Sequence, residues 1–300
     1  MTDSLEWIVI SNPLSGRRKD RRTRDRVVSA LKAHQSSFVL IEEVSSHDAT
    51  TKLCPLLDSS TDLKGVIVVG GDGTVHQTVN AINRLSSERA TTPPFGVVPA
   101  GTGNDFATQC GLNRLSPEEL VTLFVSTPPS KIDVISVNDL VCLQVLSTGF
   151  DACISQRSKG LPSFLGNARY VLALLSELIR LKTIPFNLEI DGSTFQRSAL
   201  MVSCASGRNY GGGMLISPNS DHQDGRLECI ILHPVSRMEL LRVFPRIFSG
   251  THINHPAFEV KGFRRLSLRA ATIAQGDGEA MFDRPVDLEV GIKPMLTWKT

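Results

Sequence analysis

The sequence predicts an α/β domain with a parallel sheet, followed by a domain of mostly antiparallel strands. In the first third, short apolar runs alternate with segments of helical spacing, which is the pattern of parallel strands joined by helices. After the proline-containing stretch Ser126–Ser130, strand-like runs follow one another with few helices between them. The length of 300 residues also exceeds what most single hydrophobic cores need, so two domains are expected.

The first domain contains four apolar runs that are expected to form strands: Trp7–Ile10, Phe38–Ile41, Gly65–Val69 and Phe95–Val98. The third run is continuous and rich in β-branched residues, as is typical of a strand buried on both faces. Helices are expected from the basic segment to about Leu31, at Ala49–Leu57, at Val75–Leu85, and briefly after Asp105.

The second domain is expected to consist mainly of strands separated by turns. The strand-like runs include Val141–Leu146, Ala199–Ser203, Leu227–Leu232 and Leu266–Arg269. Two segments favour helices, Asn167–Leu181 and Ser236–Phe248. The first is apolar but is interrupted by Glu177 and Arg180, so a core helix or the wall of an apolar groove is favoured over a membrane span.

The composition is that of an ordinary globular protein, with 41% hydrophobic and 21% charged residues. It excludes a disordered chain and a protein with many membrane spans. The start of the chain shows no signal peptide, and six scattered cysteines lack metal-ligand spacing, so reduced thiols in the cytoplasm are expected. A net charge of only +2 argues against a nucleic-acid partner for the molecule as a whole.

Positive charge is nevertheless concentrated in one segment. Residues 17–26 carry seven basic side chains in ten positions. A solvated helix face is the simpler interpretation. The alternative is attraction to phosphate groups or to an anionic membrane surface.

Two glycine-rich loops each follow an expected strand and precede an expected helix. Residues 70–74 read Gly-Gly-Asp-Gly-Thr, and residues 101–105 read Gly-Thr-Gly-Asn-Asp. Open parallel sheets bind ligands beyond the carboxyl ends of their strands, and the N–H groups of helix starts attract anions. Either loop alone could be an ordinary turn, but the pair favours a phosphate site. The carboxylate of Asp72 within it indicates Mg²⁺, because a cation would offset its repulsion of phosphate.

Neither loop matches the common nucleotide-binding motifs. A Walker A loop needs Gly-Lys-Ser/Thr, which is absent from residues 70–74. The second loop has the first two glycines of the dinucleotide fingerprint, but Phe106 stands where the third glycine belongs.

Two acidic turns lie in the second domain. A β-hairpin accounts for Asp277-Gly278, but not for Glu279, which has the chemistry of a base that accepts a hydroxyl proton. In residues 221–226, Asp221 and Asp224 are three apart. This segment is either a surface hairpin or a site for a hard divalent cation that also uses backbone carbonyls.

These motifs together resemble the diacylglycerol kinase catalytic family, which includes bacterial lipid kinases and is related to sphingosine and ceramide kinases. The resemblance covers nearly the whole chain, and the second loop, with its Asn-Asp-Phe-Ala ending, is its most specific part. The first loop is shared with NAD kinases. The matching motifs are Asn12-Pro13-x-Ser15-Gly16, Gly70-Gly71-Asp72-Gly73-Thr74, Pro99-x-Gly101-Thr102-Gly103-Asn104-Asp105-Phe106-Ala107, Gly149-Phe150-Asp151-Ala152, Gly211-Gly212-Gly213-Met214, Ser217-Pro218, Asp224-Gly225 and Asp277-Gly278-Glu279.

The resemblance implies an N-terminal α/β nucleotide-binding domain similar to those of NAD kinases and phosphofructokinases, and a C-terminal antiparallel β-sandwich. The expected bounds are residues 1–130, rejoined by residues 288–300, and residues 131–287, with the nucleotide in the cleft between the domains.

The resemblance also implies which residues form the site. Glu279 would be the catalytic base, with Asp72 and Asp105 in the magnesium–water network. ATP would contact Asn12, Gly70, Gly71, Asp72, Gly73, Thr74, Gly101, Thr102 and Asn104, and a structural Mg²⁺ would lie at Asp221, Asp224 and Arg226.

Two positions depart from the family pattern. Many relatives have Asn-Glu after the first loop, where this chain has His76-Gln77 and so lacks the acidic side chain that a metal role there would use. A threonine that contacts the nucleotide in relatives is absent, and Ser45 is the nearest substitute.

The expected function is ATP- and Mg²⁺-dependent phosphorylation of a lipid hydroxyl, with diacylglycerol as the favoured substrate. The expected partners are ATP, the lipid and a membrane surface touched reversibly, with a homodimer left open. NAD kinase is one alternative, and a catalytically silent lipid-binding regulator is another. An acyl pocket could be lined by Phe164, Leu165, Leu172 and Leu175, or these residues could belong to the core.

Overall fold

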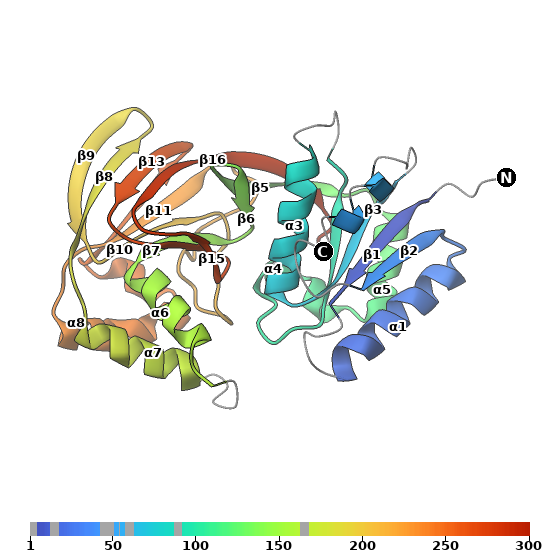
Figure 1. Ribbon diagram of the computed structural model, residues 1–300, viewed down its shortest axis with the longest axis horizontal. Helices are drawn as coiled ribbons and strands as arrows, with labels where there is room; N and C mark the ends of the chain where they lie inside the picture. Colours follow the sequence, from blue (N-terminus) through green and yellow to red (C-terminus); the bar gives the residue numbers. More distant parts are fainter. Residues whose placement is uncertain are drawn as a thin grey trace. The chain divides into compact units, whose positions relative to one another are not determined.

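The computed structural model describes residues 5–12, 18–42, 51–53, 55–57, 63–86, 92–162 and 168–300. The chain divides into two compact units (Figure 1). Unit 1 consists of residues 1–132 and 294–300, and unit 2 consists of residues 133–293.

Unit 1 contains a parallel sheet with the strand order β2-β1-β3-β4, and the end of β16 lies beside β4. Every residue of β1 and β3 is buried, because α3 covers one side of the sheet while α1 and α5 cover the other (Figure 1). The elements are β1 (Trp7–Ser11), α1 (Arg18–Ala33), β2 (Phe38–Glu42), β3 (Gly65–Gly70), α3 (Asp72–Ser86), β4 (Phe95–Pro99), α4 (Asp105–Gln109), η1 (Leu112–Arg114), α5 (Pro117–Ser126) and the end of β16 (Val286–Thr297).

The last residues of the chain are anchored in unit 1 by an aromatic cluster. The ring centroid of Trp298 lies 5.7 Å from that of Trp7 and 5.2 Å from that of Phe124. The indole N–H of Trp298 donates to the carbonyl of Thr127 at 2.8 Å. Aromatic pairs at these distances add packing energy beyond the area they bury, so the C-terminus is an integral part of this unit.

Unit 2 contains two antiparallel sheets. The start of β16 pairs with β13, β13 with β8 and β8 with β9, and the second sheet has the order β12-β11-β10-β7-β14-β15. The strands are β5 (Ser130–Val137), β6 (Leu140–Cys142), β7 (Val145–Gly149), β8 (Ile184–Ile190), β9 (Ser193–Ala199), β10 (Met201–Ala205), β11 (Leu227–Leu232), β12 (Phe258–Phe263), β13 (Arg265–Ala270), β14 (Ala274–Gly276) and β15 (Glu279–Phe282).

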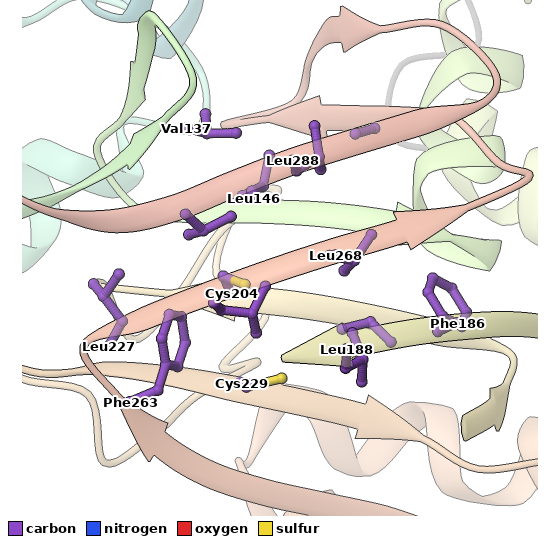
Figure 2. Packing of buried hydrophobic residues seen from close by; sticks show 14 of the residues in the cluster. Val137, Leu146, Phe186, Leu188, Cys204, Leu227, Cys229, Phe263, Leu268 and Leu288 are labelled. Carbon is purple, nitrogen blue, oxygen red and sulfur yellow. The ribbon is translucent and has the colours of Figure 1, made fainter. Parts of the chain in front are cut away.

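The core of unit 2 lies between these sheets. Alternate residues of facing strands enter it, among them Leu188 of β8, Leu268 of β13, Cys204 of β10 and Cys229 of β11 (Figure 2). This alternation is the packing of a β-sandwich. The five cysteines in the described residues are free thiols, and all but Cys153 are buried.

Helices cover the other face of the second sheet. Residues such as Met201 of β10 and Ile230 of β11 pack against them in a second core. Because both faces are covered, β11 has almost no exposed position, which explains its nearly continuous apolar sequence. These helices are α6 (Phe150–Lys159), α7 (Ala168–Ile179), α8 (Arg237–Val243), η3 (Phe244–Phe248) and η4 (Thr251–Asn254).

The predicted fold class, a parallel α/β domain followed by an antiparallel sandwich, is confirmed. Several details were wrong or missing. The strand expected at Ala199–Ser203 spans the end of β9 and the start of β10. Helices α5 and α6 were not predicted, and the single strand expected at Val141–Leu146 is two strands, β6 and β7. In the described residues, no helix combines the length and the hydropathy needed to cross a bilayer.

Candidate functional site

The predicted phosphate loops of unit 1 begin at the same edge of its sheet. Ser11 of β1 lies opposite Val69 of β3, and Gly70 lies opposite Pro99 of β4. Asn12 and both glycine loops therefore follow strands that end at one level. This is the edge where open parallel sheets bind ligands.

The two loops are in direct contact. The N–H of Ala100 donates to the carbonyl of Gly70 at 2.9 Å. A Cβ atom added at Gly101 would lie 2.5 Å from the Cα of Gly71, and one added at Gly71 would lie 3.1 Å from the Cα of Gly101. Glycine is required at Gly101 because any side chain there would push the two backbones apart.

Asp72 joins the loops through both oxygens of its carboxylate. Oδ2 accepts the N–H of Asn104 at 2.7 Å, and Oδ1 accepts the N–H of Asp105 at 2.8 Å. Asp72 begins α3 and Asp105 begins α4, so the carboxylate lies at two helix N-termini. Both positions favour a negative charge. A Cβ at Gly103 would lie 2.6 Å from Oδ2, so a larger residue there would displace the carboxylate of Asp72.

The second loop is further closed by the side chain of Asn104. Its Oδ1 accepts the N–H of Gly101 at 3.0 Å, and its Nδ2 donates to the carbonyl of Gly101 at 2.9 Å. Asn104 has a left-handed backbone, with φ 54° and ψ 41°, which asparagine tolerates better than most residues. The loop is therefore preorganised by its own side chains.

The remaining predicted residues of unit 1 lie around these contacts. The carboxylate of Asp105 is buried, with 7% of the residue exposed. Thr74 packs against Gly70, since a Cβ there would meet the threonine side chain at 2.7 Å, and Thr102 is exposed. Asp72 and Asp105 could hold a hard cation with their remaining lone pairs. The sequence argument found no role for Asp72 other than a cation, whereas its hydrogen bonds to the second loop provide one.

In the acidic hairpin of unit 2, the carboxylates of Asp277 and Glu279 have different surroundings. Asp277 and Gly278 have positive φ values of 52° and 83°, which is the geometry of a tight hairpin turn. The carboxylate of Asp277 accepts three backbone N–H groups, from Leu143 at 2.7 Å, Gln144 at 2.8 Å and Val145 at 3.2 Å. Asp277 therefore fixes the break between β6 and β7.

Glu279, by contrast, is available at the surface of unit 2. It begins β15, and its side chain is 35% exposed. Oε2 accepts the ammonium of Lys159 at 2.6 Å. Sequence reasoning missed Lys159, because it lies at the end of α6, a helix that was not predicted, and 120 residues before its partner. The pair keeps a carboxylate in a defined position with a cation beside it.

The second acidic turn, residues 221–226, is stabilised by its own side chains. Asp221 accepts the N–H of Gln223 at 3.1 Å, and Asp224 accepts the N–H of Arg226 at 2.9 Å. Each aspartate has a second oxygen free of these bonds. Across the described residues, no three His, Cys, Asp or Glu side chains converge as a metal-binding group. A cation here would depend on two carboxylates and backbone oxygens.

Comparisons with known proteins bear on both units. A sequence model of the diacylglycerol kinase catalytic domain matches residues 6–137, and one of the YegS C-terminal NAD kinase beta sandwich-like domain matches residues 144–296. A diacylglycerol kinase of Mycobacterium tuberculosis is 35% identical over 250 residues, which cover 81% of this chain and 78% of that protein. The chain belongs to the diacylglycerol kinase catalytic family.

Two further proteins are similar to this chain. A diacylglycerol kinase of Bacillus subtilis is 28% identical over 256 residues, covering 82% of this chain and 80% of that protein. The crystal structure of a diacylglycerol kinase from Bacillus anthracis superposes with a TM-score of 0.75 at 18% identity, over 100% of this chain and 99% of that one. At 18% identity, the similarity to the Bacillus anthracis structure shows a shared fold.

Of the two positions that depart from the family pattern, the structure describes His76. His76 is buried in α3, and its carbonyl accepts the side-chain amide of Asn80 at 3.0 Å. The side chain at position 76 is therefore a buried imidazole that packs within unit 1. Ser45 lies outside the described residues.

A buried polar cluster in unit 2 was not assigned a role from the sequence. Asp151, of the family motif at residues 149–152, accepts the hydroxyls of Tyr170 at 3.0 Å and Tyr210 at 2.7 Å, and the amide of Gln275 at 3.0 Å. Burial first, and then the charge of Asp151, raise the pKa of both tyrosines well above 10, so they remain donors. The motif Gly-Phe-Asp-Ala was the only signal of this cluster.

The polar cluster of Asp151 borders a small cavity in unit 2. Asp151 and its tyrosines line an apolar cavity of about 40 Å³, which holds only a few water molecules. Of the four residues considered for an acyl pocket, Phe164 and Leu165 lie outside the described residues. Leu172 and Leu175 do not belong to the core, because they are 45% and 44% exposed.

The basic segment forms part of α1, where acids neutralise two of its side chains. Arg24 pairs with Asp25 and Glu42, and Arg26 pairs with Glu118 at 2.5 Å. These contacts support the interpretation of this segment as a solvated helix face.

Proposed function

We propose that this protein is an ATP- and Mg²⁺-dependent lipid kinase that transfers the γ-phosphate of ATP to a lipid hydroxyl, converting diacylglycerol to phosphatidic acid. The observation that carries this proposal is the pair of glycine loops locked together by Asp72 at the carboxyl edge of a parallel sheet. Membership of the family and the names of the relatives support the substrate class.

Binding of ATP is assigned to the loops of unit 1. The glycines of residues 70–74 and 101–105 let the backbone approach the phosphates, and the N-termini of α3 and α4 offer partial positive charge to them. Asn12, Thr74 and Thr102 stand around this edge and contribute side-chain contacts. The loops are preorganised by Asn104, so little ordering is needed when the nucleotide binds.

Mg²⁺ would be held by Asp72 and Asp105, with a structural ion at Asp221, Asp224 and the backbone near Arg226. When bound beside the nucleotide, it supplies neutralisation of the phosphate charge. The residues present suit this ion, because carboxylate and carbonyl oxygens are its usual ligands.

Glu279 is assigned the role of general base. Its partly exposed carboxylate accepts the proton of the lipid hydroxyl as the hydroxyl oxygen bonds to the γ-phosphorus. The bond from that phosphorus to the β–γ bridging oxygen breaks, and ADP leaves. Lys159 holds this carboxylate in position. Asp277 is not a candidate, because three backbone N–H groups already occupy its carboxylate.

The test offers the purified protein labelled ATP with diacylglycerol, NAD and a total lipid extract in parallel reactions. Label in phosphatidic acid, dependent on Mg²⁺ and lost with EDTA, is expected. Label in NADP alone would identify a NAD kinase, and absence of label from every acceptor would indicate a lipid-binding regulator. The lipid extract identifies the acceptor if it is another lipid alcohol.

A further inference from the structure

Large apolar side chains are exposed together on the helices of unit 2. Four belong to α7 and three to α8 and η3: Val171 (51%), Leu172 (45%), Leu175 (44%), Ile179 (72%), Met238 (60%), Leu241 (36%) and Phe248 (56%). We call these seven residues the α7–α8 face. In the described part of the chain, only Val260 and Leu296 are comparable apolar residues outside it.

The exposed residues of α7 form one stripe along the helix. Val171, Leu172, Leu175 and Ile179 are spaced one, four and eight positions from the first, as on a single helix face. The opposite face is also apolar, with Ala173, Leu174 and Leu178 packed in the core of unit 2. A helix that is apolar on both faces is expected to have an apolar environment on both.

The stripe continues onto α8. The guanidinium of Arg237, the first residue of α8, donates to the carbonyl of Ile179 at 2.8 Å. The most exposed residue of α7 therefore lies beside the start of α8, where Met238 is also exposed. Figure 1 shows α7 and α8 on the same side of the unit.

Positive charge adjoins one end of this face. Arg180 and Lys182 follow the stripe directly, and both are exposed. With Arg284 they line a cavity of about 360 Å³. The acid of this cavity, Glu177, is already paired with Arg157. Thr272, buried in the cavity wall, has a hydroxyl with no hydrogen-bond partner in the described structure.

We propose that the α7–α8 face docks on an anionic lipid bilayer, with the apolar stripe in the interfacial region and a lipid phosphate in the cavity of Arg180, Lys182 and Arg284. Apolar side chains and basic residues together are what an anionic bilayer surface attracts. A partner protein with a matching apolar patch would leave these cations without a counterpart. The inference rests on the proposed function in one respect, because it places the lipid substrate within reach of the protein.

The test measures vesicle binding by sedimentation, without any enzymatic readout. The wild type is expected to bind phosphatidylcholine–phosphatidylglycerol vesicles more tightly than phosphatidylcholine vesicles, and less tightly as salt rises. Ile179→Asp should weaken binding by at least about tenfold, since it removes a large apolar contact. Val260→Asp, on β12, is the matched control and should bind as the wild type. Arg180→Gln and Lys182→Gln should each weaken binding about fivefold.

A fluorescence variant locates the contact. Trp7 and Trp298 are buried in unit 1, so Ile179→Trp adds an exposed reporter. Brominated lipid in the vesicles should quench its emission. Inorganic phosphate should not reproduce the vesicle response.

Three results would overturn the proposal. The first is unchanged vesicle binding by Ile179→Asp. The second is loss of binding through Arg21→Gln and Arg22→Gln in α1 while Ile179→Asp binds normally. The third is a dimer in light scattering that Ile179→Asp dissociates without changing vesicle affinity. Phosphorylation of a short-chain, water-soluble diacylglycerol by Ile179→Asp tests the kinase separately, since that activity does not need the bilayer.

Discussion

The carboxylate of Asp72 and the backbone N–H of Asn104 are 2.7 Å apart, although 32 residues separate them in the chain. This bond and its companion to Asp105 hold the two phosphate loops in one arrangement. Asp72 thus has a structural role in unit 1 in addition to the cation role proposed for it.

Replacing Asp72 by asparagine is therefore expected to affect both stability and activity. An amide has one acceptor oxygen, so one of the two backbone donors would face an NH₂ group. The expected loss in the free energy of unfolding is about 1–3 kcal/mol, measured by urea denaturation. A variant as stable as the wild type would show that the bonds to the second loop contribute nothing, even if activity were lost.

Gly101→Ala is expected to separate the loops. The added methyl group would lie 2.5 Å from the Cα of Gly71, and a shift that relieves this contact would strain the adjacent hydrogen bond from Ala100 to Gly70. The expected cost is about 1–3 kcal/mol, together with weaker ATP binding by calorimetry. Gly291→Ala is the control, because its nearest neighbour would be 3.8 Å away. Equal melting temperatures for the two variants would contradict this explanation.

Substitutions of the two carboxylates of the acidic hairpin, Asp277 and Glu279, are expected to have different effects on the free energy of unfolding. Asp277→Ala leaves three backbone N–H groups without their acceptor, so the free energy of unfolding should fall by at least about 2 kcal/mol. Glu279→Gln should leave it nearly unchanged, because Glu279 is partly exposed. Thermal unfolding of both variants under one condition makes the comparison. A strongly destabilised Glu279→Gln would mean that this carboxylate also serves the fold.

The buried side chain of His252 is expected to make the folded protein less stable at acidic pH. Burial is the main cause that lowers its pKa below 6.5, and its Nδ1 has no partner among the described residues. As pH falls below 6.5, the unfolded chain takes up a proton before the folded protein does. Stability should therefore be complete above this pH and should decline toward the pKa of the folded state.

His252→Gln should reduce that decline, measured by urea denaturation between neutral and mildly acidic pH. The glutamine amide can still donate to the carbonyl of Ile216, which His252 contacts at 3.1 Å. A smaller slope is expected to remain, since burial also lowers the pKa of His222. An unaltered slope in the variant would exclude His252 as a source of acid sensitivity.

The strands were the most predictable part of the fold. β11 occupies the expected residues 227–232, and β3 extends the expected run by one residue, because strands covered on both faces require continuous apolar sequence. Helix α6 was not predicted, and its buried apolar residues Phe150, Ala152 and Ile154 are two positions apart, which is the spacing of a strand rather than of a helix. Helix α5 has a capping box of Ser116 and Glu119, a signal present in the sequence but not used.

The sequence predicted the parts of the candidate site that lie within one short motif. The glycines and Asp72 could be selected because loops between strands and helices have a recognised pattern. The bonds from Asp72 to the second loop could not, since a backbone N–H has no sequence signature. Lys159 is a similar case, because only folding brings it to Glu279.

The most direct test of the account compares turnover and ATP binding in Glu279→Gln with those of the wild type. Labelled ATP, Mg²⁺ and a short-chain diacylglycerol are used, so that vesicle binding has no influence. The account predicts that ATP affinity by calorimetry is retained while kcat falls by at least about 100-fold, as expected when a general base is removed. Undiminished kcat in this variant would contradict the assignment of Glu279 as the base.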